Sequence, residues 1–148
     1  MKNPPTYEDA NLILKLYDLR REERLRAARK WMASQPQFAS RAEWLTICPP
    51  GSEENASYRM VTTYWEMAAS FVATGVLNPD LFFRANNLEL LLIWEKVKVI
   101  VPEMRAAAGN PVMMRSMEQV AQLFIAHLNE HAPGYYETFS ANMAKMGR

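Results

Sequence analysis

The chain has 148 residues, of which 49% are hydrophobic and 11% aromatic, and this composition excludes an intrinsically disordered protein. The length suits one globular domain, which we expect to span residues 1–148. Lysine and arginine number 17 against 16 for aspartate and glutamate, and the resulting net charge of +1 argues against a strongly basic nucleic-acid-binding protein.

We expect a cytoplasmic protein without a membrane span. The opening residues, MKNPPTYED, contain no apolar run of the kind that a signal peptide requires. No uncharged apolar run approaches the roughly 18 residues of a transmembrane helix, because Glu66 interrupts one candidate and Glu89 with Glu95 another. Cys48 is the only cysteine, so no internal disulfide can form and a reducing compartment is expected.

A long first helix is predicted over residues 6–34. Thr6 followed by Asp9 forms an imperfect capping box, and apolar residues then recur at helical spacing. Such a helix is about 42 Å long, whereas the radius of gyration of a domain of this size is about 15 Å. We therefore expect its far end to overhang the bundle and to expose Trp31 and Met32 unless another chain covers them.

The basic residues of this segment are concentrated in RREERLRAARK (Arg20–Lys30), which could form a nucleic-acid or anionic-membrane patch. However, Glu22 and Glu23 interrupt the run, and pairs such as Glu22 with Arg26 are typical of a solvated helix face. No aromatic residue lies within the run to stack on bases. We expect no nucleic-acid binding tighter than the non-specific range of about 10⁻⁴ to 10⁻⁶ M at physiological salt.

The middle of the chain predicts a short helix at SRAEWL (40–45), a loop at CPPGS (48–52) and a third helix from Glu53 to Thr74. The apolar side chains of the third helix form two adjacent stripes, so we expect it to be the central, largely buried helix. Arg59 and Glu66 lie two turns apart on its polar line. There they could flank a small polar pocket, although a solvated Glu66 is the simpler interpretation.

A fourth helical segment begins at Asn78-Pro79, which pairs a capping residue with a first-turn proline. The β-branched run VKVIV (97–101) is compatible with a strand, but its helical phase with both flanks favours a helix. Pro102 is expected to kink this helix. Glu95 lies opposite the apolar stripe and is therefore expected to be solvated.

Gly109-Asn110-Pro111 repeats the same stop and start, so a fifth helix is predicted from there to Pro133-Gly134. The last stretch, YYETFSANMAKM (135–146), predicts a short amphipathic helix whose apolar side needs a surface to bury against. The chain is thus predicted to be all-α: a single-domain irregular bundle of about five main helices, with a long N-terminal helix and a short C-terminal amphipathic one.

The stretch HLNEH (127–131) matches the His-x-x-Glu-His pattern of inverted zinc peptidases. His127 and His131 share a helix face and could both bind zinc, with Glu130 as the general base. The motif still needs a third ligand, and Glu137 is the only acidic residue that follows. We therefore favour an ordinary helix end with His131 facing the core, where the histidines suit the helix dipole, and we expect no bound metal.

No other pattern identifies a catalytic or cofactor-binding residue. Neither histidine has a glutamate three residues before it, as di-iron bundles require. The five glycines are isolated, so no phosphate-binding loop is predicted, and nothing beside Cys48 in the sequence would lower its pKa. The ten methionines suit either an adaptable binding groove or gap-filling in a helical core, and we favour the core.

Three runs carry a resemblance to a known family: YDLRREERLRAARKW (17–31), YRMVTTYWEMAASFVATGVLNPDLFF (58–83) and IWEKVKVIVPEMR (93–105). Together they resemble a family of small bacterial all-helical proteins catalogued only as a domain of unknown function. The likeness spans roughly residues 7–125. It implies a helical fold and a bacterial origin, transfers no activity, and does not reach HLNEH.

Two functions remain open from the sequence. The first is a non-enzymatic interaction module that self-associates as a homodimer through the first helix and the C-terminal stretch. The alternative is a small-molecule-binding or enzymatic helical bundle with a pocket near Arg59, Glu66, His127 and His131.

Overall fold

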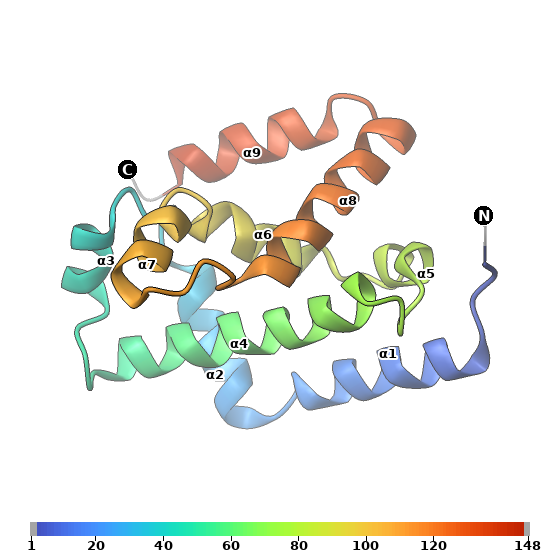
Figure 1. Ribbon diagram of the computed structural model, residues 1–148, viewed down its shortest axis with the longest axis horizontal. Helices are drawn as coiled ribbons and strands as arrows, with labels where there is room; N and C mark the ends of the chain where they lie inside the picture. Colours follow the sequence, from blue (N-terminus) through green and yellow to red (C-terminus); the bar gives the residue numbers. More distant parts are fainter. Residues whose placement is uncertain (1–2, 147–148) are drawn as a thin grey trace.

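The computed structural model describes residues 3–146, and all regular secondary structure in this range is helical (Figure 1). The predicted all-α class is confirmed, but the chain divides into more helices than expected. The nine helices of the described range are α1 (Tyr7–Leu19), α2 (Glu23–Ala33), α3 (Arg41–Ile47), α4 (Glu53–Ala73), α5 (Pro79–Arg84), α6 (Leu88–Val97), α7 (Val101–Ala108), α8 (Arg115–His131) and α9 (Tyr135–Lys145).

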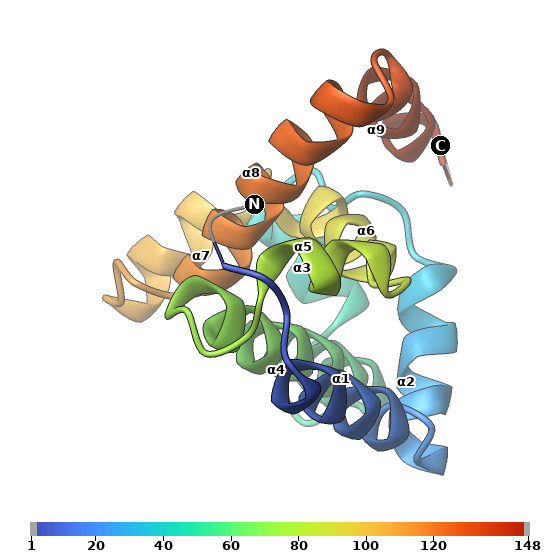
Figure 2. The same cartoon turned by 90° about the vertical axis from the view of Figure 1, so that its right-hand side faces the viewer.

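Helix α4 is the central helix, as predicted. It packs against α2 on one side and α8 on another, and α1 lies along it (Figures 1 and 2). Ser52 caps its N-terminus, because its side chain accepts a hydrogen bond from the backbone N–H of Asn55. Its inward face is fully buried at Val61, Trp65 and Ala68. Helices α2 and α8 therefore take their positions from α4.

The predicted single helix over residues 6–34 is wrong, because the chain turns between α1 and α2. Helix α1 ends at Leu19, and Glu22 restarts the helix by accepting a hydrogen bond from the backbone N–H of Leu25 at 2.9 Å. Helix α2 then folds back across α4 (Figure 1). As a result Met32 is fully buried and Trp31 half-buried, so neither is exposed at an overhanging end.

The predicted fourth segment is also divided. Residues 85–87 separate α5 from α6, and residues 98–100 separate α6 from α7. Pro102 lies in the first turn of α7, where its missing N–H leaves no helical hydrogen bond unmade. The expected kink is therefore a break between two helices. The fifth helix begins later than predicted, at Arg115, because Met114 adopts the left-handed conformation with φ of 56°.

The last two helices form a hairpin over α6 (Figure 2). Met143 of α9 is buried, and Tyr136 and Phe139 pack against the hydrophobic core. The C-terminal amphipathic helix thus buries its apolar side on its own chain. None of the helices in residues 3–146 is long and apolar enough to cross a lipid bilayer.

Candidate functional site

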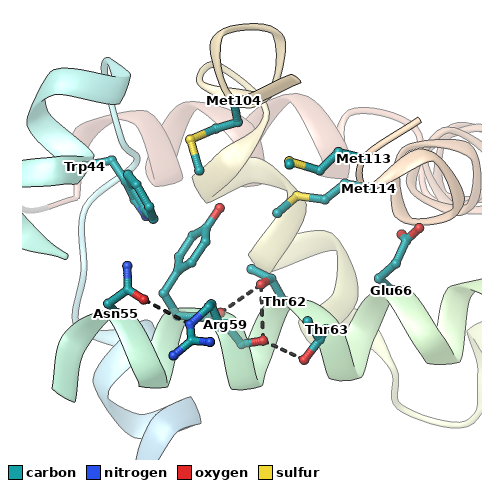
Figure 3. Close-up of a pocket in the computed structure, with 10 residues that line it drawn as sticks. Trp44, Asn55, Arg59, Thr62, Thr63, Glu66, Met104, Met113 and Met114 are labelled. Atoms are coloured by element: carbon teal, nitrogen blue, oxygen red, sulfur yellow. Dashed lines mark hydrogen bonds between the residues drawn. The ribbon is translucent and has the colours of Figure 1, made fainter. Parts of the chain in front are cut away.

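A pocket of about 320 Å³ lies between α3, α4, α7 and the loop that precedes α8 (Figure 3). Figure 3 shows three methionine side chains facing α4 and the tryptophan of α3 across this space. The residues that line the pocket are Trp44 of α3, Asn55, Tyr58, Arg59, Thr62, Thr63 and Glu66 of α4, Met104 of α7, and Met113 and Met114 of the loop.

Helical spacing explains why α4 supplies most of the wall. Its lining residues recur every three or four positions and therefore lie on one face of the helix. Trp44 is brought to the pocket by α3, whose N-terminus is capped by the Ser40 side chain, as predicted. Met113 and Met114 line the pocket, whereas Met117 is fully buried in the core. Methionines thus occur both in a pocket wall and in the core.

The loop that closes the pocket is held at two points. Arg105 donates a hydrogen bond from Nε to the carbonyl oxygen of Met113 at 2.8 Å and forms an ion pair with Glu118 at 3.0 Å. On the other side, the Glu66 carboxylate accepts hydrogen bonds from the backbone N–H groups of Ser116 at 3.2 Å and Met117 at 2.7 Å. These contacts hold the pocket wall in place from both sides.

Glu66 is thus not the solvated residue that its position on the polar line of α4 predicted. It is half-buried, and its carboxylate caps the N-terminus of α8, where the helix dipole favours negative charge. Arg59 is exposed at the pocket, and its Nε donates to Asn55 Oδ1 at 2.9 Å. The two residues do line one pocket, as the sequence suggested, but this pocket is mainly apolar.

Two polar groups in the pocket wall have no hydrogen-bond partner within residues 3–146. Trp44 Nε1 and the Tyr58 hydroxyl are buried without a hydrogen bond among the described residues. The two side chains are only 8% and 3% exposed, and their rings meet edge to face with centroids 5.2 Å apart. Burial raises the pKa of Tyr58, so its phenol stays protonated and can donate. A buried polar group left unpaired typically costs about 1–3 kcal/mol.

The histidines do not belong to this pocket, so the predicted grouping of Arg59, Glu66, His127 and His131 is wrong. They lie at the far end of α8, where their rings stack with centroids 4.3 Å apart. His131 is exposed and does not face the core as predicted. Its Nδ1 lies 2.9 Å from the carbonyl oxygen of His127. Within residues 3–146, no three His, Cys, Asp or Glu side chains are grouped to hold a metal ion.

Cys48 lies in the core, where burial raises the pKa of its thiol to about 11. The thiol therefore stays protonated near neutral pH and is unsuited to act as a nucleophile. This agrees with the sequence, in which nothing beside Cys48 would lower its pKa.

Glu95 was expected to be solvated and is instead fully buried. It forms an ion pair with Lys98 and accepts a hydrogen bond of 3.4 Å from the Ser140 hydroxyl of α9. The prediction of a solvated Glu95 failed because α6 packs against both α8 and α9. Helix α9 covers the face of α6 that the sequence of α6 marks as polar.

The chain matches the model of one protein family. A model described as a domain of unknown function (DUF4760) matches residues 5–124. This range contains every residue that lines the pocket and ends within α8, before the two histidines. No curated protein and no solved structure matches the chain.

Proposed function

The chain belongs to the DUF4760 family, whose description names no activity, so we propose a function from the pocket of the chain itself. We propose that the domain binds a small apolar molecule that carries a hydrogen-bond-accepting oxygen. One observation carries the proposal. Two residues that line the pocket, Trp44 and Tyr58, carry buried polar groups that are without partners among the described residues. In native structures such groups are rare and call for an explanation.

The lining of the pocket defines the ligand further. Methionine and aromatic side chains suit an apolar body, because thioethers are polarisable and adapt to varied shapes. Trp44 Nε1–H is a donor only, and the protonated Tyr58 hydroxyl can donate as well, so the matching group is an oxygen acceptor. A volume of about 320 Å³ lies at the small end of ligand sites in proteins.

Binding rather than catalysis is favoured by the state of the polar residues. The Glu66 carboxylate is occupied by two backbone N–H groups, and Tyr58 is held in its neutral form. Neither group is poised to take a proton from a substrate near neutral pH. We therefore propose that residues 1–148 form one non-enzymatic domain. Its core contains residues from helices between α1 and α8.

The test is a thermal-shift screen of alcohols, ketones and carboxylates with an aromatic or medium-chain aliphatic body, followed by calorimetry on each hit. A molecule that binds only the native state raises the melting temperature. Tyr58→Phe is expected to stabilise the free protein by about 1 kcal/mol, because it removes an unpaired hydroxyl, and to weaken binding about fivefold or more.

Tyr64→Phe is the matched control. Tyr64 is also a buried tyrosine of α4, but its hydroxyl donates to the carbonyl oxygen of Leu16 and does not line the pocket. This change should destabilise the protein and leave ligand affinity unchanged. The proposal fails if no compound binds, or if both variants weaken binding equally.

Self-association is the second candidate, and the exposed side of α1 favours it. Leu14 is 64% exposed and Tyr7, two turns earlier on the same face, is 90% exposed. Two large exposed apolar side chains on one helix face are compatible with an interaction surface. We therefore propose a homodimer in which the two copies contact each other through α1. We also propose a bacterial cytoplasm as its location, because reducing conditions suit the free thiol of Cys48.

A further inference from the structure

A second pocket, of about 430 Å³, lies where α1 turns into α2. Four arginine side chains line it: Arg20, Arg21, Arg26 and Arg29. The sequence spreads these residues along what was predicted to be one straight helix. The turn at residues 20–22 brings them around a single hollow, which lies apart from the apolar pocket.

Arg20 is a buried cation, only 6% exposed. Its guanidinium carbon lies 5.1 Å from the ring centroid of Tyr17 and 5.3 Å from that of Trp65. Nη1 donates to the amide oxygen of Asn87 at 2.8 Å. Among residues 3–146, Arg20 forms no ion pair with a carboxylate. A charge that is taken out of water normally requires an opposite charge beside it, and here aromatic faces and a neutral amide hold it.

One carboxylate lines the pocket, and it is already engaged. Glu89 accepts from Arg29 Nε at 2.8 Å and from Trp65 Nε1 at 3.1 Å. Arg29 in turn donates from Nη1 to the carbonyl oxygen of Arg20 at 3.1 Å, which ties the two helices together. Four guanidinium groups against one carboxylate leave three positive charges in excess around the hollow.

The remaining two arginines are available to a ligand. Arg21 and Arg26 are exposed, and neither guanidinium group forms a hydrogen bond or an ion pair with the described residues. The guanidinium of Arg21 lies 5.7 Å from the Tyr17 ring centroid. A fixed, buried arginine and two free ones around one hollow form the arrangement that recognises phosphate oxygens by paired N–H donors.

We propose that this pocket binds the phosphate group of a small soluble ligand. A small ligand fits better than a nucleic acid, because the basic residues surround a hollow and do not follow an extended track. Arg24 lies two residues before Arg26 and therefore points to the other side of α2, outside the pocket. The site is independent of the apolar pocket, so Tyr58→Phe should leave it intact.

Calorimetric titration of the full chain with sodium pyrophosphate tests the proposal. We expect saturable binding of one pyrophosphate per chain, which weakens as sodium chloride is added. The double variant Arg21→Gln/Arg26→Gln should weaken it about tenfold or more, because two charge-assisted donors are lost. Arg24→Gln is the matched control and should change the affinity less than about twofold. All three residues are exposed, and unchanged melting temperatures would show that the variants fold.

Three outcomes would overturn the inference. The first is that pyrophosphate binding does not saturate in the millimolar range. The second is that Arg24→Gln weakens binding as much as the double variant does, which would indicate non-specific attraction. The third concerns the source of the phosphate. Sedimentation with vesicles that contain phosphatidic acid, together with a failure to bind pyrophosphate, would assign the arginines to a membrane surface instead.

Discussion

At the scale of single residues, Lys96 shows how far burial can alter a charged group. Its side chain has no exposed surface, and Nζ donates to the carbonyl oxygens of Ala33, at 3.2 Å, and Gln35. These carbonyls belong to the end of α2 and the turn that follows it, so one lysine ties α6 to the end of α2. Desolvation lowers the pKa of Lys96 from 10.5 to about 8.

This pKa predicts a rise of stability with pH. Between about pH 8 and 10.5 the unfolded chain holds a proton on Lys96 that the folded chain has lost, so the free energy of unfolding increases with pH in that window. The Lys96 contribution from pH 8 to 9.5 is about 1.5 kcal/mol, since the folded side chain is still half protonated at pH 8. Denaturant unfolding of the wild type and of Lys96→Met at both pH values measures it.

The comparison with Lys96→Met is needed because other groups titrate in the opposite sense. Burial raises the pKa of Cys48 from 9.0 to about 11 and also raises the pKa of Tyr58, so both groups favour the folded state less as the pH rises, Cys48 already near pH 9. Those contributions are common to both proteins and cancel in the difference. An equal pH dependence in both proteins would contradict the altered pKa of Lys96.

At the scale of elements, helix α8 illustrates a helix start that its own sequence does not specify. Its N-cap position is Met114, which makes no side-chain cap, and the two N–H groups of Ser116 and Met117 are bound by Glu66 of α4 instead. The cap comes from 50 residues away in the chain. The same interaction fixes the loop that closes the apolar pocket.

Removal of the Glu66 cap should destabilise α8 and, at the same time, increase the mobility of the loop that lines the apolar pocket. Glu66→Ala is expected to lower the free energy of unfolding by about 1–2 kcal/mol, as loss of an N-cap does, and to speed amide exchange at Ser116 and Met117. Glu66→Gln keeps an acceptor without the charge and should lose less. If Glu66→Ala leaves exchange at these two amides unchanged, the carboxylate does not hold α8.

At the scale of the whole molecule, the α1–α2 turn and the α8–α9 hairpin change which surfaces are free. Both the end of the predicted long helix and the C-terminal amphipathic helix are covered by their own chain. They therefore no longer support a dimer through swapped elements. The exposed side of α1, with Leu14 and Tyr7, is the surface that remains for self-association.

Light scattering of the full-length protein at micromolar concentration is expected to give a dimer. Leu14→Ser should shift it toward the monomer, because it removes an exposed apolar side chain from the proposed interface. Leu123→Ser is the matched control: Leu123 is 45% exposed on α8, and α8 lies on the opposite side of α4 from α1 (Figure 1). A monomeric wild type would rule out the homodimer.

Local signals were sufficient to predict the class of the fold and many helix ends. Thr6 and Asp9 form the expected capping box, Ser40 caps α3, and α4 ends at the residue before Thr74. These features depend on residues within one turn of each other, so a sequence displays them directly. The family resemblance likewise covered the range that the family model matches.

What the sequence by itself determined was an all-helical chain with an amphipathic, central α4 and with Arg59 and Glu66 on one face of it. Only the tertiary structure decided that α1 and α2 separate at residues 20–22, that Glu95 and Lys96 are buried, and that the histidines lie far from the pocket. The physical reason is that the polar and apolar faces of a helix are set by residues one turn apart in the sequence. Burial depends instead on which other helices pack against those faces. A polar face stays polar in a sequence even where another helix covers it.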